Sequence, residues 1–178
     1  MSKDILEKTL AALNALCGEK PLREVSLRET AERAGVSLVE VYRVAPSKTA
    51  LVDHLGRRLD EAALATAATS SQGDAHDRLF DAAMARIEAM EPWRAVLAGI
   101  EPAEALPLAP HLPRAARAIL EAAGVEATPV RLAAMTLVWA RIVRVWRGDE
   151  GALNRTMAEI DLQLKLLRRR LNFLGQGF

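Results

Sequence analysis

Two helix-start signals stand close together near the beginning of this sequence, and they constrain the fold more than any other feature. Ser26 is followed three residues later by Glu29. Ser37 is followed in the same way by Glu40. In each pair, the hydroxyl and the carboxylate can accept hydrogen bonds from backbone N–H groups that would otherwise lack a partner, which favours the start of a helix. Because the second signal follows the first by eleven residues, the helix between them must be short and must end in a tight turn.

The residues around these signals define a small helical module. Gly35 suits the left-handed conformation that ends a helix, so the first short helix is predicted to end at Ala34. Pro46 disfavours helix at the residue before it, so the second must stop near Ala45. Apolar residues at three- and four-residue steps predict a preceding helix over 2–17. This arrangement is typical of a helix-turn-helix, whose second helix can enter the major groove of DNA.

The rest of the chain also reads as helical. Hydrophobic residues make up 51% of the sequence and aromatic residues only 4%, and the abundant Ala, Leu, Glu and Arg favour helix over sheet. We expect a polar linker at 69–74 and an irregular proline-rich connection at 101–113, with further helices over 47–68, 75–90, 93–100, 114–123, 129–147 and 152–174. The predicted fold is therefore all-α with about nine helices: a helix-turn-helix module over 1–48 and a helical-bundle body for ligand binding and dimerisation over 49–178.

Two groups of apolar residues in the body are candidates for binding. The last helix carries a heptad pattern from Leu153 to Leu174, and together with the helix before it this predicts a homodimer interface formed by Val138, Ile142, Ile160, Leu164, Leu167 and Leu171. A second group is a candidate pocket for a small apolar ligand, because methionine and aromatic side chains suit irregular cavities: Phe80, Met84, Ile87, Trp93, Leu97, Ile119, Met135 and Trp139. The alternative for this second group is that it only fills the core.

At the stretch AERAGVSLVEVYRVAPSKTALVDHL, the chain resembles the TetR family of transcriptional regulators. The resemblance covers residues 5–55 and includes the Gly35-Val36-Ser37 turn, the late Tyr42 and the Ser47-Lys48 pair. It implies a double-stranded DNA partner, a homodimer and a repressor controlled by a small effector. It also implies phosphate contacts for Tyr42 and Lys48, and places at or near DNA the residues Ser37, Leu38, Val39, Glu40, Arg43 and Ser47.

Two departures from the family pattern leave alternatives open. Val44-Ala45 stand where the family usually has His-Phe, and Glu40 stands where a small residue is common. Glu40 either caps its helix or accepts from a cytosine amino group. Residues 1–60 carry ten Lys and Arg against nine Asp and Glu, which argues against strong nonspecific DNA affinity. The alternative function is a TetR-like protein without DNA binding, similar to the lipid-binding accessory proteins of ubiquinone biosynthesis. A purely structural helical dimer is a third.

The sequence argues against other classes of function. His54, His76 and His111 have no metal-ligand spacing, and no catalytic motif occurs, so we expect neither an enzyme nor a cofactor. The paired carboxylates Asp60-Glu61 are expected on a solvated helix face. The single cysteine, Cys17, excludes an internal disulfide and favours a cytoplasmic location. No charge-free stretch is long enough to predict a membrane span.

Overall fold

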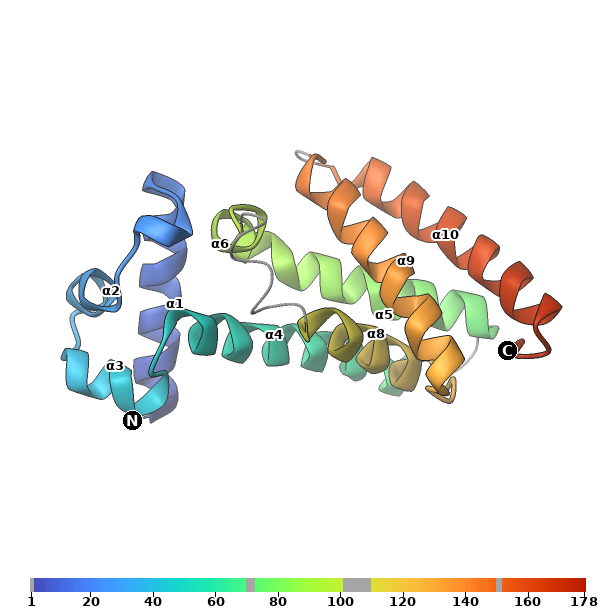
Figure 1. Cartoon of the computed structure of the whole chain (residues 1–178), viewed down its shortest axis with the longest axis horizontal. Coiled ribbons are helices and arrows are strands. Elements are labelled where there is room, and N and C mark those ends of the chain that lie inside the picture. Colours follow the sequence, from blue (N-terminus) through green and yellow to red (C-terminus); the bar gives the residue numbers. More distant parts are fainter. Residues whose placement is uncertain (1, 70–72, 101–109, 150–151) are drawn as a thin grey trace. The chain divides into compact units, whose positions relative to one another are not determined.

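The computed structural model describes residues 2–69, 73–100, 110–149 and 152–178. All regular elements among these residues are helices, which confirms the all-α prediction (Figure 1). Three short 3-10 turns at Leu22–Glu24, Thr66–Ala68 and Glu91–Trp93 accompany the α-helices. The α-helices are α1 (Ser2–Glu19), α2 (Leu27–Ala34), α3 (Leu38–Val44), α4 (Lys48–Ala65), α5 (Ala75–Met90), α6 (Arg94–Ala98), α8 (His111–Ala122), α9 (Pro129–Arg147) and α10 (Asn154–Phe173).

Internal contacts divide the chain into two compact units. Among the described residues, the first unit comprises 2–57 and 90–100, and the second comprises 58–69, 73–89, 110–149 and 152–178. Helix α4 contributes to both units, and α6 belongs with the N-terminal helices although it follows α5 in sequence. No single position in the sequence therefore separates the two units. The predicted functional division at residue 48 stays a prediction.

In the first unit, α1 packs against α2, α3 and α6. Its predicted apolar stripe is buried, with Leu10 and Leu13 each 1% exposed. The Asn14 amide links this helix to α6 and to the turn before it, because it donates to the Pro92 carbonyl at 2.8 Å and accepts from the Val96 N–H at 3.2 Å. Helix α1 continues past the predicted end at Cys17 to Glu19, since a glycine close to a helix end interrupts no hydrogen bond.

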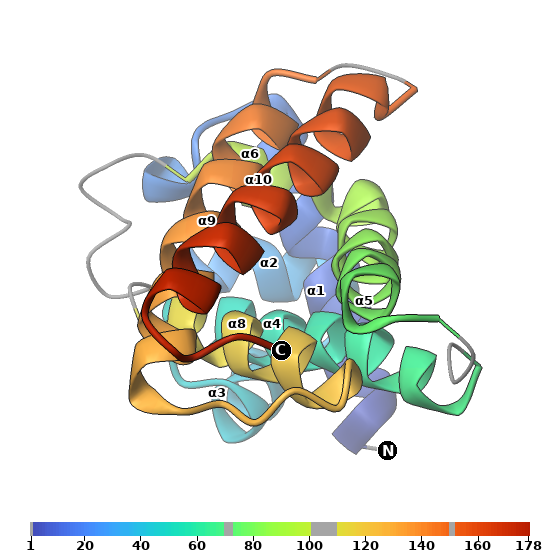
Figure 2. The same cartoon turned by 90° about the vertical axis from the view of Figure 1, so that its right-hand side faces the viewer.

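In the second unit, α9 packs side by side with α10 and also against α8 (Figures 1 and 2). The heptad pattern of α10 is real, but its central positions from Ile160 to Leu171 face the core of the same chain, while Met157 and Leu174 near the ends of the pattern are exposed. This corrects the predicted dimer interface, because a side chain already buried within one chain has little surface left to lose to a partner. The six predicted residues are all at most 8% exposed: Val138, Ile142, Ile160, Leu164, Leu167 and Leu171.

Several predicted boundaries in the second unit also change. Most of the predicted irregular connection at 101–113 lies outside the described residues, but its end is helical, because α8 already begins at His111. Pro113 is compatible with this start because the first turn of a helix needs no N–H donor. Helix α4 ends at Ala65 and a 3-10 turn follows, whereas the prediction carried the α-helix to Ala68. The predicted helices over 75–90 and 129–147 are confirmed.

The start of α10 depends on Asp149 rather than on the residue directly before the helix. Leu153 occupies that position in a left-handed conformation, with φ of 55°, and makes no side-chain cap. The buried Asp149 carboxylate instead accepts from the Thr156 backbone N–H at 2.8 Å and from its hydroxyl at 2.7 Å. These two hydrogen bonds lower the pKa of Asp149 below its ordinary value. Asp149 thus provides a charge-assisted cap for the first turn of α10.

Candidate nucleic-acid interface

Both predicted capping boxes form in the first unit. At the start of α2, the Glu29 N–H donates to Ser26 Oγ at 3.2 Å, and the Ser26 N–H donates to Glu29 Oε2 at 2.8 Å. Ser37 and Glu40 repeat the pattern at the start of α3, with distances of 3.2 and 2.9 Å. Between the helices, Gly35 has φ of 65°, as predicted for a left-handed turn residue. Local hydrogen bonds alone therefore fix where α2 ends and where α3 begins.

Helix α3 presents one side to solvent. Leu38 is 40% exposed, Val39 60% and Tyr42 62%, and Ser37 and Arg43 are also exposed. On the opposite side of the helix, Val41 is fully buried and anchors α3 to the unit. These residues form a solvent-exposed face on α3, as the prediction of a reader helix requires; their contact with DNA stays a prediction.

Glu40 is held in the cap rather than projecting from the helix. Its Oε2 atom accepts from both the backbone N–H and the hydroxyl of Ser37. These hydrogen bonds lower the pKa of Glu40 below its ordinary value. The capping interpretation is confirmed. A base contact would have to compete with two hydrogen bonds already made.

The Ser47-Lys48 pair has structural partners that the sequence pattern did not reveal. Ser47 Oγ accepts from the Ala50 N–H at 3.0 Å and caps α4. The Lys48 ammonium donates to the Leu22 carbonyl at 2.6 Å and to the Arg23 carbonyl at 3.3 Å. These carbonyls belong to the 3-10 turn after α1, about 25 residues earlier in sequence, and no local motif links them to Lys48. The phosphate contact of Lys48 stays a prediction.

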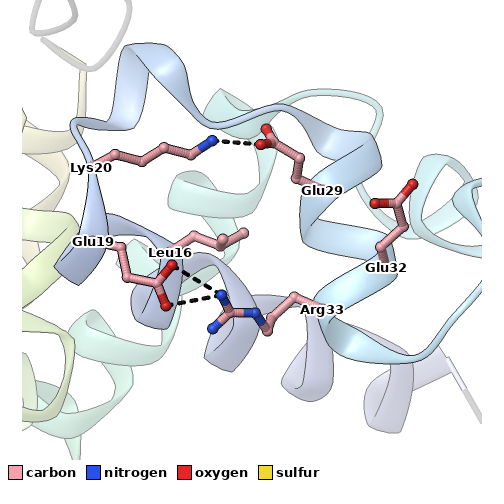
Figure 3. A pocket seen from close by; sticks show the side chains of 6 residues that line it. All are labelled: Leu16, Glu19, Lys20, Glu29, Glu32 and Arg33. Atoms are coloured by element: carbon pink, nitrogen blue, oxygen red, sulfur yellow. Dashed lines mark hydrogen bonds and ion pairs between the residues drawn. The ribbon is translucent and has the colours of Figure 1, made fainter.

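An open hollow of about 760 Å³ lies between the end of α1 and α2 (Figure 3). Arg33 donates to both oxygens of Glu19, at 2.9 and 3.0 Å, and Lys20 donates to Glu29. The bond from Lys20 and the two from Ser26 lower the pKa of Glu29 to about 2. These ion pairs brace α1 against α2, and this hollow was not predicted from the sequence.

A buried charge cluster in the second unit was also missed, and one prediction about it was wrong. Asp60 is not on a solvated face: it is 7% exposed and contacts two arginines. Arg86 donates to Asp60 Oδ1 at 3.1 Å, and Arg114 donates to Oδ2 at 2.8 Å. The Arg86 guanidinium also lies 4.9 Å from the centre of the Trp139 ring, a cation–π contact. Burial lowers the pKa of Arg86, while the Asp60 carboxylate opposes this shift.

The predicted ligand-pocket residues are distributed over both units. Trp93 and Leu97 lie in the first unit and are half-buried. In the second unit, Phe80 and Met84 are half-buried, whereas at most 1% of the surface is exposed at Ile87, Ile119, Met135 and Trp139. The packing of Arg86 on Trp139 gives that ring a role in the core. The apolar pocket stays a prediction.

Two other kinds of feature are absent from the described ranges. No group of three or more His, Cys, Asp or Glu there is arranged to hold a metal ion. None of the helices described is both long and apolar enough to cross a membrane.

The fold and the capped pair α2–α3 define a helix-turn-helix protein with a helical body. No protein-family model matches the chain, and no curated protein matches it significantly. Several solved structures, however, match the chain in fold. It is similar to a TetR transcriptional regulator from Nitrosomonas europaea, at 21% identity and a TM-score of 0.72, with 94% of this chain and 97% of the other covered.

Two further solved structures agree with this likeness. A TetR transcriptional regulator from Rhodococcus sp. RHA1 has 23% identity and a TM-score of 0.67, with 93% of this chain and 96% of that chain covered. A TetR-family transcriptional regulator from Streptomyces coelicolor has 17% identity and a TM-score of 0.57, with 98% and 84% covered. The chain therefore has the fold of TetR-family transcriptional regulators, as the resemblance over residues 5–55 predicted.

Proposed function

We propose that this protein is a DNA-binding transcriptional regulator that reads the major groove with α3. The observation that carries the proposal is the exposed face of α3, set on a helix that is capped at its start and anchored by the fully buried Val41. A helix fixed on one side and free on the other is what a major-groove reader requires. The fold shared with TetR regulators supports the same function.

The proposed regulator acts as a homodimer through a second apolar stripe on α9 and α10. This stripe lies opposite the buried seam of α10 and is exposed in the single chain: Leu137 is 74% exposed, Leu162 50% and Phe173 90%. A hollow of about 210 Å³ between the two helices adjoins the stripe and is lined by Ala134, Leu137, Val138, Gln163, Leu166, Leu167 and Arg170. A second copy that covers the stripe would remove this apolar surface from water.

A dimer explains how one reader helix per chain gives sequence specificity. Two α3 helices would enter successive major grooves roughly 34 Å apart on one face of the duplex. In this proposal the protein is a cytoplasmic repressor, and a small apolar effector bound in the body favours a dimer whose readers no longer match that spacing. Such an effector acts only through its different affinity for the two states.

A binding experiment tests the proposal directly. The full-length protein is incubated with duplexes from the region upstream of its own gene, and with duplexes selected from a random pool, at two salt concentrations. We expect a retarded complex that weakens as salt rises, because phosphate contacts release counterions. Arg43→Ala should weaken binding to all sequences and reduce the salt dependence. No complex with any duplex at low salt would refute the proposal.

A specific observation favours the second candidate, a TetR-like protein that does not bind DNA. Lys48, which the resemblance assigns to a phosphate, is bound to the Leu22 and Arg23 carbonyls. In this case the helical body would bind an apolar lipid. Lys48→Ala separates the two candidates: it weakens DNA binding if Lys48 contacts a phosphate, and only lowers the stability of the first unit if its role is structural.

A further inference from the structure

At the start of α3, the outward face carries two side chains that cannot form hydrogen bonds to base edges. The first two residues of the helix, where a reader helix makes its base contacts, are the apolar Leu38 and Val39. Both side chains are exposed, at 40% and 60% of their surface. Exposed leucine and valine at these two positions need a physical explanation, since neither can donate or accept a hydrogen bond.

The polar groups nearest to these two residues already have partners. Ser37 Oγ accepts from the Glu40 N–H and donates to Glu40 Oε2 at 2.6 Å. The Glu40 carboxylate is held by the same cap. The polar side chains that remain on the outward face of α3 are Tyr42 and Arg43, which lie one turn further along the helix. The start of α3 can therefore recognise bases mainly through apolar contacts.

Only one base offers an apolar group in the major groove. Thymine carries a C5-methyl group there, whereas the other base edges present hydrogen-bond donors and acceptors. An aliphatic side chain pressed against such polar edges would strip water from them without replacing its hydrogen bonds, which costs free energy. Against a thymine methyl, the same side chain gains by burying apolar surface.

We infer that Val39, assisted by Leu38, determines specificity by contacting thymine methyl groups in each half-site of the operator. This inference rests on the proposed DNA-binding function and extends it to a base and to two residues. The reading helix then selects A·T pairs at the step that it contacts. It excludes G·C pairs there because their groove edges carry no methyl group.

The test replaces single thymines by deoxyuridine, which lacks the methyl group but keeps every hydrogen-bonding atom. Duplexes are first selected from a random pool with the full-length protein, and each thymine of the consensus is then replaced in turn. We expect roughly fourfold weaker binding for each contacted methyl that is removed, from the free energy of burying one such group. The ratio between thymine and deoxyuridine duplexes should be the same at low and high salt, because a methyl group is uncharged.

Two variants assign the effect to a residue. Val39→Ala should bind the thymine and deoxyuridine duplexes almost equally at the contacted position. Arg43→Ala, the matched control on the same face, should weaken binding to both duplexes and leave their ratio unchanged. Thermal unfolding checks that both variants fold, which the exposure of both side chains leads us to expect.

The outcomes separate this inference from the function on which it rests. If the pool yields no bound duplex, the DNA-binding proposal fails and the inference fails with it. If duplexes are bound but every deoxyuridine substitution leaves affinity unchanged, only the thymine-methyl inference is overturned. It is overturned in the same way if Val39→Ala keeps the full preference for thymine.

Discussion

The two capping boxes of the first unit and the Asp60 cluster of the second satisfy their polar groups over very different distances along the chain. In the first unit, both capping boxes join residues only three positions apart, and the groups involved are exposed. In the second unit, the buried Asp60 carboxylate is held by Arg86, 26 residues away, and by Arg114, 54 residues away. The capping boxes thus shape a surface with local bonds, whereas the Asp60 cluster ties three separate segments together inside the core.

This difference determines how much each interaction matters for stability. When an exposed cap is removed, the groups that it bonded can form hydrogen bonds to water instead. The free energy of unfolding therefore falls only slightly. A buried charge has no such exchange, and removing the group that neutralises it leaves the desolvation penalty unopposed. Removing a polar side chain should therefore lower the free energy of unfolding more at the buried cluster than at an exposed cap.

The largest effect is expected at the buried cluster. Asp60→Ala removes the carboxylate that both arginines contact, and we expect it to lower the free energy of unfolding by about 4 kcal/mol. The matched control is Arg57→Ala on the same helix, whose ion pair with Asp53 is exposed and should contribute at most about 0.5 kcal/mol. Urea unfolding followed by circular dichroism measures both. Equal losses would contradict the contrast between buried and exposed charges.

The two apolar faces of α10 should separate folding from association. Leu164 is 1% exposed, and Leu164→Ala should cost about 3 kcal/mol of folding free energy because it leaves a cavity. Leu162 is 50% exposed, and Leu162→Lys should leave the fold intact but shift a dimer toward monomer. Unfolding curves measure the first effect and analytical ultracentrifugation the second. If the wild-type protein sediments as a monomer, the proposed dimer stripe is refuted.

The contrast between local and long-range bonds also explains what the sequence made predictable. The short helices α2 and α3, with their caps and the Gly35 turn, follow from signals confined to a few neighbouring residues, and the structure confirms them. The heptad pattern of α10 correctly predicts an apolar stripe. It does not say which helix covers that stripe, because α9 of the same chain and a second copy would impose the same periodicity.

Long-range partners account for most of what the sequence did not predict. Lys48 pairs with carbonyls of a turn that lies 26 and 25 residues earlier, and Asp60 sits beside Glu61 in a pattern that resembles a solvated face. Nothing within one helical turn of either residue distinguishes a buried partner from water. The exposed residues of α3, in contrast, could be anticipated because the buried Val41 fixes which side faces inward.

Replacing two glycines of the first unit by alanine should change the stability by smaller amounts and in opposite directions. Gly35 has a left-handed backbone with open space around the position of a Cβ atom, so Gly35→Ala should cost about 1 kcal/mol through backbone strain alone. Gly18 lies within α1, and a Cβ there would meet only Ala95, at an ordinary 4.0 Å. Gly18→Ala should therefore stabilise the protein by roughly 0.5 kcal/mol. Thermal unfolding that gives both changes the same sign would contradict this assignment.

The smallest effect concerns the half-buried ion pair of Lys20 and Glu29 in the hollow between α1 and α2. The pKa of Glu29 falls from 4.5 to about 2 in the folded protein, chiefly through its bond with Lys20. A carboxyl whose pKa is lower in the folded than in the unfolded protein contributes its full stabilisation at pH above the unfolded-state pKa. This stabilisation is lost as pH falls through the folded-state pKa. We therefore expect the protection of α2 amides against hydrogen exchange, taken relative to the intrinsic exchange rate at each pH, to decrease as pH falls from 4.5 to about 2. Glu29→Gln should remove this pH dependence, whereas Glu32→Gln, in the same hollow, should retain it.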